Sequence, residues 1–520
     1  MGRFSARTLG CPRRFHGVGG PHRKAPRPRI HDRIFEVTRL LSWNDVTFAY
    51  EQSGKNDILQ NASLTIEPGR VTVLTGASGC GKSTLLYLAC GLYPKNAGVV
   101  KQGGVTIGGR DVSAIFPEER ARLVCMMFQN PDLQFCMDTV KNELVFCLEN
   151  VRTPPEEMDV LIDSALSFCN ITHLKDRLLV TLSGGEKQKA LLACMVALRP
   201  KWLLLDEPFA NIDPAAARQI ANKLQQMRDQ FGTGIVAVDH HLDNWTDIAD
   251  EVIVIERKGV TALRGVCPQN LPLAELEKLG VSAPSLPYQT KKPAKPGAPE
   301  PILKLRDVCV TIGGQPILSG LDAQFYRGRI HAVTGASGSG KSTLFGALCG
   351  LHRYDGSIEL CGRELKKTRP RSLGRLLGFV FQNPQDQFVS GSVLGEITTS
   401  LKTVLREPEI DAEAERILRA TGLWRYRFVS PYMLSQGQQR RLAVAALLAY
   451  RCELLVCDEP TYAQDRNSLR TLMAELQSQV ADRGLTLIFS THDEKLAREY
   501  ADHTYRLEGG RLYEITEPGV

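Results

Sequence analysis

Short apolar runs recur along this chain, and each is followed directly by glycine or by a polar side chain. The runs in the first part are Val71–Thr75, Val124–Phe128, Trp202–Leu205 and Ile235–Val238, and those in the second are Ile330–Thr334, Phe379–Phe381, Leu454–Cys457 and Leu487–Phe489. Continuous apolar runs of this length are typical of buried parallel strands. A further strand-like segment, Leu40–Tyr50, precedes the first part. We therefore expect two sets of buried strands, with function at the residues that follow them.

The residues that follow these runs occur twice in the same order, which predicts a duplicated domain. Four segments, Phe128-Gln129-Asn130-Pro131, Leu182-Ser183, Asp206-Glu207-Pro208 and His240, recur as Phe381-Gln382-Asn383-Pro384, Leu434-Ser435, Asp458-Glu459-Pro460 and His492. The separation is nearly constant, at about 250 residues. We predict a basic disordered leader or misassigned start over residues 1–40, a first domain over 41–275, a proline-rich linker over 276–301 and a second domain over 302–520.

Composition and charge exclude several classes of protein. The net charge is only +7 and much of it lies in the leader, so no nucleic-acid groove is expected. No run of about 18 apolar residues predicts a membrane span. The 14 cysteines are scattered without paired spacing, which suits reduced thiols in a cytosol.

The strongest chemical signal is a glycine-rich loop between a strand and a helix, present in both copies. The two loops are Gly76-Ala77-Ser78-Gly79-Cys80-Gly81-Lys82-Ser83-Thr84 and Gly335-Ala336-Ser337-Gly338-Ser339-Gly340-Lys341-Ser342-Thr343. Both fit the phosphate-binding pattern, in which backbone N–H groups and a helix N-terminus surround phosphate oxygens. Lys82 and Lys341 would reach the β- and γ-phosphates of a nucleotide, and the hydroxyls of Ser83 and Ser342 would ligate Mg²⁺.

Acidic, amide and imidazole side chains at the ends of other strands complete a candidate ATPase site. Asp206 and Asp458 can hold Mg²⁺ through its water shell, and Glu207 and Glu459 can polarise the attacking water. The amides of Gln129 and Gln382 can ligate Mg²⁺ or orient water. The repeated histidines, His240 and His492, are predicted to contact the γ-phosphate.

A second anion site is predicted where Leu182-Ser183-Gly184-Gly185-Glu186 precedes a helical stretch. Ser183 occupies the expected N-cap, and the glycines leave backbone N–H groups bare. The segment lies far in sequence from the phosphate loop, and a monomer would hardly need two anion sites.

The order of these motifs resembles that of the ATP-binding cassette (ABC) ATPases over nearly everything from residue 42 onward except the linker. This resemblance implies two tandem P-loop NTPase domains of α/β class, each with an antiparallel β part and a helical subdomain. It implies head-to-tail pairing of the two cassettes within the chain, with each ATP held between one phosphate loop and the opposite signature, Ser183-Gly184-Gly185 or Ser435 and Gly437. Gln129 and Gln382 would head loops that sense a membrane partner, and Asp213 and Asp465 would lie where the cassettes meet.

The segments that begin at Gln129 and Gln382 resemble the Q-N-P-D-x-Q segment of energy-coupling factor ATPases. That group drives uptake of vitamins and transition-metal ions from the cytoplasmic face of the membrane, beside an integral-membrane coupling subunit and a substrate-binding membrane subunit. Two alternatives remain open, a fused ATPase of sugar uptake and a soluble translation factor with two cassettes. The transported substrate cannot be read from this sequence.

Three departures from the family pattern predict unequal sites. Gln436 replaces a signature glycine, Asp239 precedes His240 where Thr491 precedes His492, and Ile312 stands opposite Tyr50, the expected adenine-stacking aromatic. In addition, Cys80 stands where the second loop has Ser339. Because Cys80 would lie at a helix N-terminus beside Lys82, we expect a reactive thiolate that ATP protects.

Overall fold

The computed structural model describes residues 40–50, 57–77, 79–209, 212, 214–259, 261–266, 300–336, 338–460 and 466–515. Nearly all of the predicted leader and linker lies outside these residues, as do Ser78, Asp213, Ser337 and Asp465. Their predicted roles stay predictions.

Two sheets form from the first copy of the repeat. The antiparallel sheet has the order β2-β1-β4-β5, made of β1 (Leu41–Ala49), β2 (Leu59–Ile66), β4 (Val99–Ile107) and β5 (Arg110–Asp111). The second sheet has the order β10-β9-β3-β8-β7-β6, with β3 (Val71–Thr75), β6 (Val124–Met127), β7 (Trp202–Asp206), β8 (Gly234–Val238), β9 (Glu251–Ile255) and β10 (Thr261–Val266). Strands β6, β7, β8, β3 and β9 are parallel and only β10 runs antiparallel.

The helices of the first copy are α1 (Lys82–Ala89), α2 (Pro117–Leu123), α3 (Val140–Asn150), α4 (Pro155–Phe168), α5 (Gly184–Leu198) and α6 (Pro214–Phe231). Helix α1 begins where the phosphate loop ends, as the sequence predicts. Helix α5 is buried along most of its length from Ala190 to Ala197, so it forms the centre of the helical part. It packs there against α3 and α4 in a core shared with the parallel sheet.

The second copy repeats this arrangement. Its antiparallel sheet has the order β12-β11-β14-β15, made of β11 (Pro301–Ile312), β12 (Gln315–Tyr326), β14 (Asp355–Leu360) and β15 (Arg363–Glu364). The other sheet has the order β16-β17-β18-β13-β19-β20, from β13 (Ile330–Thr334), β16 (Leu377–Val380), β17 (Leu454–Cys457), β18 (Thr486–Thr491), β19 (His503–Glu508) and β20 (Arg511–Ile515). The helices are α8 (Lys341–Leu348), α9 (Pro370–Leu376), α10 (Val393–Leu401), α11 (Glu409–Ala420), α12 (Gln436–Ala449), α13 (Arg466–Arg483) and α14 (Glu494–Tyr500).

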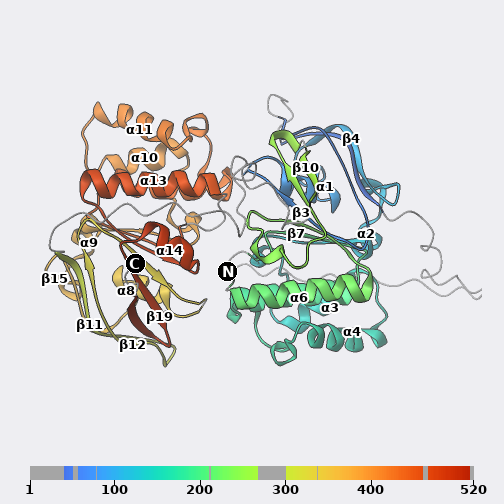
Figure 1. Cartoon of the computed structure of the whole chain (residues 1–520), viewed down its shortest axis with the longest axis horizontal. Coiled ribbons are helices and arrows are strands. Elements are labelled where there is room, and N and C mark those ends of the chain that lie inside the picture. The colour runs from blue at the N-terminus through green and yellow to red at the C-terminus, as the bar shows by residue number, and fades with distance from the viewer. Residues whose placement is uncertain are drawn as a thin grey trace, which may run out of the picture. The chain divides into compact units, whose positions relative to one another are not determined.

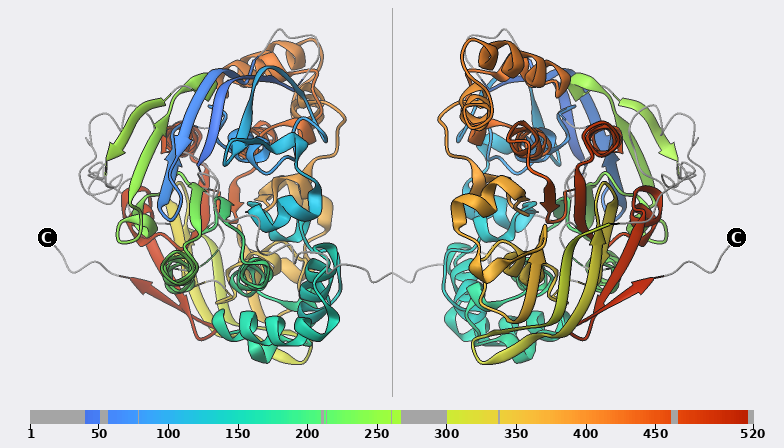
Figure 2. Two further views of the ribbon diagram at one scale, coloured as in Figure 1. Left: turned by 90° about the vertical axis from the view of Figure 1, so that its right-hand side faces the viewer. Right: turned by 90° about the vertical axis from the view of Figure 1, so that its left-hand side faces the viewer.

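Within each copy one long helix separates the strands from a pair of helices of the helical part. Helices α3 and α4 lie on the far side of α6 from β3 and β7, and α10 and α11 lie on the far side of α13 from β11 and β19 (Figure 1). Strands β11 and β12 run side by side as a long ribbon (Figure 2). The predicted α/β fold, with an antiparallel part and a helical part in each copy, is thus confirmed.

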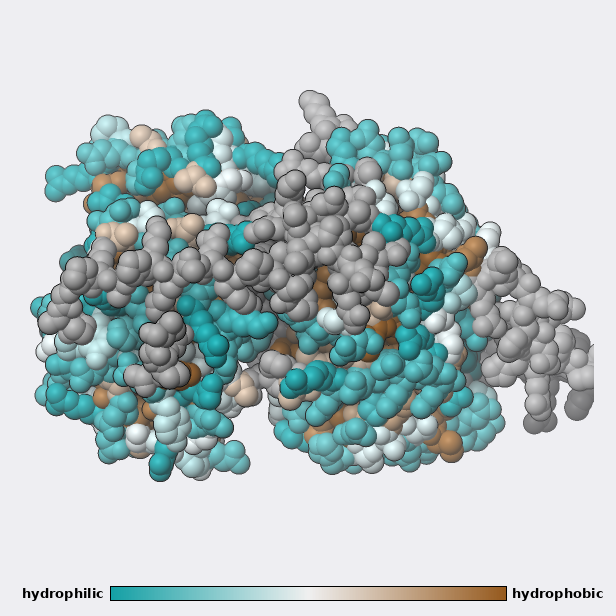
Figure 3. Space-filling model, in the orientation of Figure 1, coloured by the Kyte–Doolittle hydropathy of each residue, from teal (hydrophilic) through white to brown (hydrophobic). Residues whose placement is uncertain are grey.

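The predicted strands match the observed ones closely because their residues are apolar on both faces. All five residues of β3, of β7 and of β8 are buried. Helix α11 instead buries Ile410, Ala414 and Leu418, which recur every four residues along one face. The face of the molecule in Figure 3 is mostly hydrophilic with small apolar patches. Among the described residues, no helix combines the length and apolarity that a membrane crossing requires.

Candidate functional site

The first phosphate loop has a backbone that only glycine can adopt. Gly76, Gly79 and Gly81 have φ values of 142°, 77° and 105°. A Cβ on Gly76 would lie 2.1 Å from the carbonyl oxygen of Ile255, and one on Gly81 would lie 2.5 Å from Leu59 Cδ2. The loop is therefore closed against neighbouring strands, and its shape depends on the glycines.

The lysine of each loop folds back over the loop that it follows. Lys82 Nζ donates to the carbonyl oxygens of Gly76 and Ala77 at 2.8 and 2.9 Å. Lys341 Nζ makes the same bonds to Gly335 and Ala336 at 2.8 and 3.0 Å. Both lysines are buried, so each ammonium group is held against the backbone of its own glycine-rich loop, a type of loop that suits phosphate.

Oxygen atoms suited to Mg²⁺ lie close together beside each phosphate loop. Ser83 Oγ donates to Asp206 Oδ1 at 2.9 Å, and Tyr87 Oη donates to Asp206 Oδ2 at 3.3 Å. Ser342 likewise hydrogen-bonds to Asp458. A hydroxyl and a carboxylate beside a phosphate-binding loop fit Mg²⁺, because this ion takes few protein ligands and keeps several waters. When bound there, the ion would neutralise phosphate charge.

The sequence analysis missed two hydroxyl groups that contact these aspartates. Tyr87 lies four residues after Ser83, on the same face of α1, and this spacing was the available signal. Ser490 Oγ donates to Asp458 Oδ1 at 2.6 Å and accepts from the backbone N–H of Glu459 at 2.8 Å. Nothing local in the sequence indicated Ser490, because it lies on a different strand from Asp458.

The two predicted catalytic glutamates share an unusual backbone and a common set of neighbours. Glu207 and Glu459 have φ values of 48° and 47°, a left-handed conformation that concentrates at functional sites. Gln129 Nε2 donates to Glu207 Oε2 at 2.6 Å, and His240 Nε2 lies 3.4 Å from Glu207 Oε1. The structure therefore brings the predicted glutamine, glutamate and histidine together in the first copy.

The second copy has the same three residues in a looser arrangement. Gln382 Nε2 lies 3.4 Å from Glu459 Oε2, and His492 Nδ1 lies 3.8 Å from Glu459 Oε1. Lys341 Nζ lies 3.9 Å from the same oxygen. Both copies thus bring together the predicted glutamine, glutamate and histidine, but the distances from the glutamate to the other two side chains are longer in the second copy.

The electrostatics of the two sites also differ. Burial, followed by the charges of Asp206 and Asp239, raises the pKa of Glu207 to about 8. Burial also acts to raise the pKa of Glu459, but the interaction with His492 and the charges of Lys341 and Arg440 outweigh it, so that pKa falls below its ordinary value. Burial raises the pKa of Asp206 to about 6 and also raises the pKa of Asp458. More acidic side chains therefore act on the glutamate of the first site than on that of the second.

Asp239 accounts for part of that difference. Its carboxylate is buried and accepts from Trp245 Nε1 at 2.8 Å and from the backbone N–H of His241 at 2.9 Å. It therefore fixes the segment directly after His240. The counterpart Thr491 is neutral and accepts from the backbone N–H of Asp493 at 3.1 Å.

The signature serines occupy helix N-caps, as predicted. Ser183 caps α5 and Ser435 caps α12, each in a reciprocal capping box with the residue three positions on, Glu186 or Gln438. Gly184 and Gly185 form the first turn of α5, and Gly437 belongs to the first turn of α12. Both N-termini are thus shaped for an anion, and their pairing with the opposite phosphate loop stays a prediction.

Two predictions about residues beside the first loop, Tyr50 and Cys80, have different outcomes. Tyr50 is 45% exposed and its hydroxyl lies 3.0 Å from Thr84 Oγ1, so its ring lies beside the phosphate loop. Ile312, which stands opposite Tyr50 in the second copy of the sequence, is 43% exposed. Adenine stacking on Tyr50 stays a prediction.

Cys80, however, is only 1% exposed and packs in the apolar core, with Lys82 Nζ 3.6 Å from its sulfur. The expectation of an accessible, reactive thiol is therefore wrong for this conformation.

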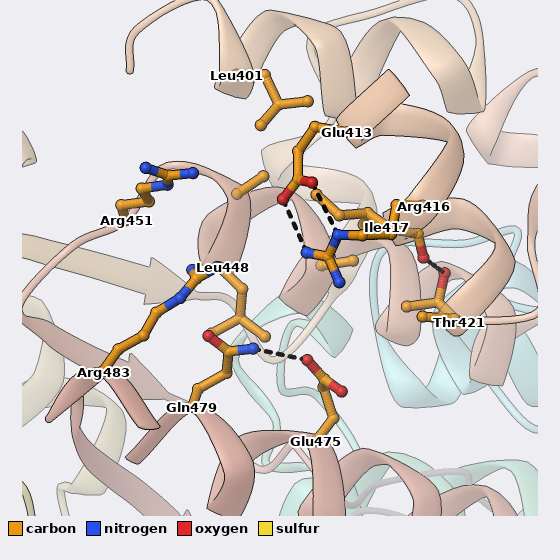
Figure 4. A pocket seen from close by; sticks show the side chains of 13 residues that line it. Leu401, Glu413, Arg416, Ile417, Thr421, Leu448, Arg451, Glu475, Gln479 and Arg483 are labelled. Carbon is orange, nitrogen blue, oxygen red and sulfur yellow. Dashed lines mark hydrogen bonds and ion pairs between the residues drawn. The ribbon is translucent and has the colours of Figure 1, made fainter. Parts of the chain in front are cut away.

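A surface pocket in the second copy is unrelated to these residues. It encloses about 450 Å³ together with its open mouth, and α11, α12 and α13 line it. Arg416 pairs there with both oxygens of Glu413 at 2.7 Å (Figure 4). Phe168 and Phe231, whose rings lie 6.0 Å apart in a tilted arrangement in the first copy, correspond in sequence to Ala420 and Arg483 in this lining. No predicted site residue is among those that line it.

Comparisons with known proteins find a family model and relatives that match this chain. The family model described as "ABC transporter" matches residues 59–210 and 318–462. An HMP/thiamine import ATP-binding protein of Bacillus subtilis, YkoD, is 34% identical over 89% of each chain, and an ABC transporter ATP-binding protein of Methanosarcina acetivorans is 31% identical over 88% of this chain and 86% of its own. The solved complex of an archaeal ribosome recycling factor with a ribosomal stalk protein has a TM-score of 0.60 at 17% identity, covering 90% of this chain and 89% of its own. That last likeness concerns the fold alone.

Proposed function

Because the chain belongs to the ABC transporter family of ATP-hydrolysing proteins, we propose that it is the ATPase subunit of a membrane importer. The substrate class we propose is that of energy-coupling factor systems, a vitamin or a transition-metal ion. The chain would lie at the cytoplasmic face of the membrane, against an integral-membrane coupling subunit that joins it to a substrate-binding membrane subunit. ATP and Mg²⁺ would bind at both phosphate loops.

The observation that carries this proposal is the surface around the two glutamine loops. In the first copy Leu133, Met137 and Val180 are 75%, 38% and 82% exposed. The segments that hold them are joined by the bond from the backbone N–H of Leu179 to the carbonyl of Asp138. Such grouped apolar side chains mark protein interfaces more often than free surface.

The second copy carries a similar group on the corresponding segments. Val389 and Met433 are 77% and 79% exposed, and the Phe388 ring lies 5.9 Å from that of Tyr432. We call these two groups, Leu133, Met137 and Val180 in the first copy and Val389 and Met433 in the second, the loop patches. One such surface beside each glutamine loop suits contact with two helices of a membrane subunit.

The Q-N-P segments support the same conclusion through a specific geometry. Gln134 accepts from the backbone N–H of Phe128 at 2.6 Å and donates to the carbonyl of Met126 at 2.9 Å. The side chain of Asn130 caps the short turn that follows. The segment is therefore fixed to β6 and presents Leu133 outward, as a docking loop requires.

Copurification tests the proposal against its alternatives. Tagged chain expressed in its own host should bring down integral-membrane proteins, and recovery of ribosomes instead would favour the translation-factor reading. Val180→Asp with Met433→Asp should abolish that recovery while ATP hydrolysis by the isolated chain persists. Val160→Asp is the matched control, because Val160 is 71% exposed on α4, outside the loop patches. Equal recovery with both variants would contradict the docking surface.

A further inference from the structure

The second copy buries an arginine at a position where the first copy has a neutral side chain. Arg440 lies on α12, five residues after Ser435, and is 2% exposed. The corresponding residue of α5 is Gln188, which is also 2% exposed. A glutamine amide has two donors and no charge, whereas a guanidinium has five donors in a planar fork.

The guanidinium of Arg440 reaches the ends of two strands at once. Nη1 donates to the carbonyl oxygens of Phe381 at 3.4 Å and Asp458 at 3.3 Å, and Nη2 donates to the carbonyl oxygen of Gln382 at 2.5 Å. These carbonyls follow β16 and β17. Arg440 thereby links the signature helix to the glutamine loop and to the strand that carries the predicted metal and water ligands.

Two of the three residues whose carbonyls Arg440 binds, Asp458 and Gln382, adjoin or contact Glu459. The carbonyl of Asp458 belongs to the peptide that leads into Glu459, whose backbone is left-handed. The side chain of Gln382 donates to Glu459 at 3.4 Å. A displacement of Arg440 would therefore move the glutamate backbone and its amide partner together, and sub-ångström changes in such groups alter rate strongly.

We propose that Arg440 is a positioning residue of the second ATP site, linking the signature that begins at Ser435 to the geometry of Gln382 and Glu459. The inference rests on the proposed ATPase roles of Glu207 and Glu459. If Ser435 also contacts the nucleotide bound at Lys82, the state of the first nucleotide reaches the second catalytic glutamate through one side chain.

The test isolates turnover at the second site in a Glu207→Gln background. We expect Arg440→Gln to lower kcat by about tenfold or more while KM for ATP changes less than about twofold, because the phosphate loop is untouched. Gln is the natural residue at the corresponding buried position, so folding should survive, and thermal unfolding checks this. Arg440→Lys should restore part of kcat by returning the charge. Arg419→Gln, which removes a surface arginine paired with Glu415, is the matched control and should leave kcat unchanged.

Coupling between the two sites has its own readout in the same Glu207→Gln background. Ser435→Ala should alter kcat at the second site, measured with Glu207→Gln, and Arg440→Gln should remove most of that effect in a double-mutant cycle. The proposal would be overturned if the Arg440→Gln protein kept the wild-type kcat. It would also be overturned if the Arg440→Lys protein lost thermal stability and activity together. Failure of the proposed catalytic roles is distinguishable, because the Glu207→Gln, Glu459→Gln double variant would then still hydrolyse ATP.

Discussion

Gln129 donates its side-chain amide to the carboxylate of Glu207 at 2.6 Å, so the first glutamine loop and the first catalytic candidate are in direct contact. The equivalent distance from Gln382 to Glu459 is 3.4 Å. A glutamate bonded to the loop that would sense a membrane partner can change orientation when that loop moves. On the proposed roles, this one hydrogen bond would join hydrolysis to partner contact.

Replacement of the two glutamates tests hydrolysis directly. Glu207→Gln and Glu459→Gln should each retain ATP binding, because the phosphate loops are unchanged, and should slow turnover at the affected site by about a hundredfold or more. Phosphate release and nucleotide binding measured on the same preparations separate the two effects. A double variant that hydrolyses ATP at the wild-type rate would disprove both assignments.

The two nucleotide sites should differ in affinity for the base. Tyr50→Ile should weaken ATP binding at the first site by about 1–3 kcal/mol, a typical loss for one base stacked on an aromatic ring. Tyr50→Phe should retain most of the affinity, although it loses the contact with Thr84. Calorimetric titration in the Glu207→Gln, Glu459→Gln background would resolve the two sites, and Ile312→Ala serves as control at the second.

Thiol labelling should follow burial. Exposed Cys136 should react with maleimide quickly, whereas Cys80 should react only as the protein opens. Cys80→Ser should keep nearly full turnover, because Ser339 occupies the same position in the second loop. Peptide mapping after timed labelling decides this, and fast, ATP-sensitive labelling of native Cys80 would show that the loop opens in solution.

Acid should destabilise the second copy through His331. Burial lowers the pKa of His331 to about 3, far below its ordinary value, so the folded state holds the ring neutral while the unfolded state takes up a proton. This contribution to stability is present above about pH 6.5 and is lost as pH falls toward 3. His331→Thr, which copies Thr72 of β3, should lose less stability than the wild type between pH 7.5 and pH 5. Urea unfolding at both pH values checks this, and equal losses would contradict it.

ATP should close the chain on itself. At ~3 Å per residue, about 30 extended linker residues reach up to roughly 90 Å, enough for the two copies to face each other. Light scattering of the Glu207→Gln, Glu459→Gln protein with Mg-ATP should therefore give the mass of one chain, 57.5 kDa. A doubled mass would mean that the copies pair between chains.

The sequence by itself determined the buried strands that precede the site residues, the duplicated order and the groups at the ends of those strands. These features are local, since β3, β7 and β17 are continuous apolar runs and the phosphate loop is a contiguous pattern. The capped serines, Ser183 and Ser435, were predictable for the same reason, because a cap depends on residues within one turn.

Only the tertiary structure decided which distant residues meet. It places Cys80 in a core formed with β1 and β2, which no local signal could indicate, and it brings Asp239 to Trp245 and Arg440 to the ends of β16 and β17. The opposite pKa shifts of Glu207 and Glu459 arise in this way as well. Each shift sums burial and charge from residues far apart in the chain, and these become neighbours only when the sheets and helices pack.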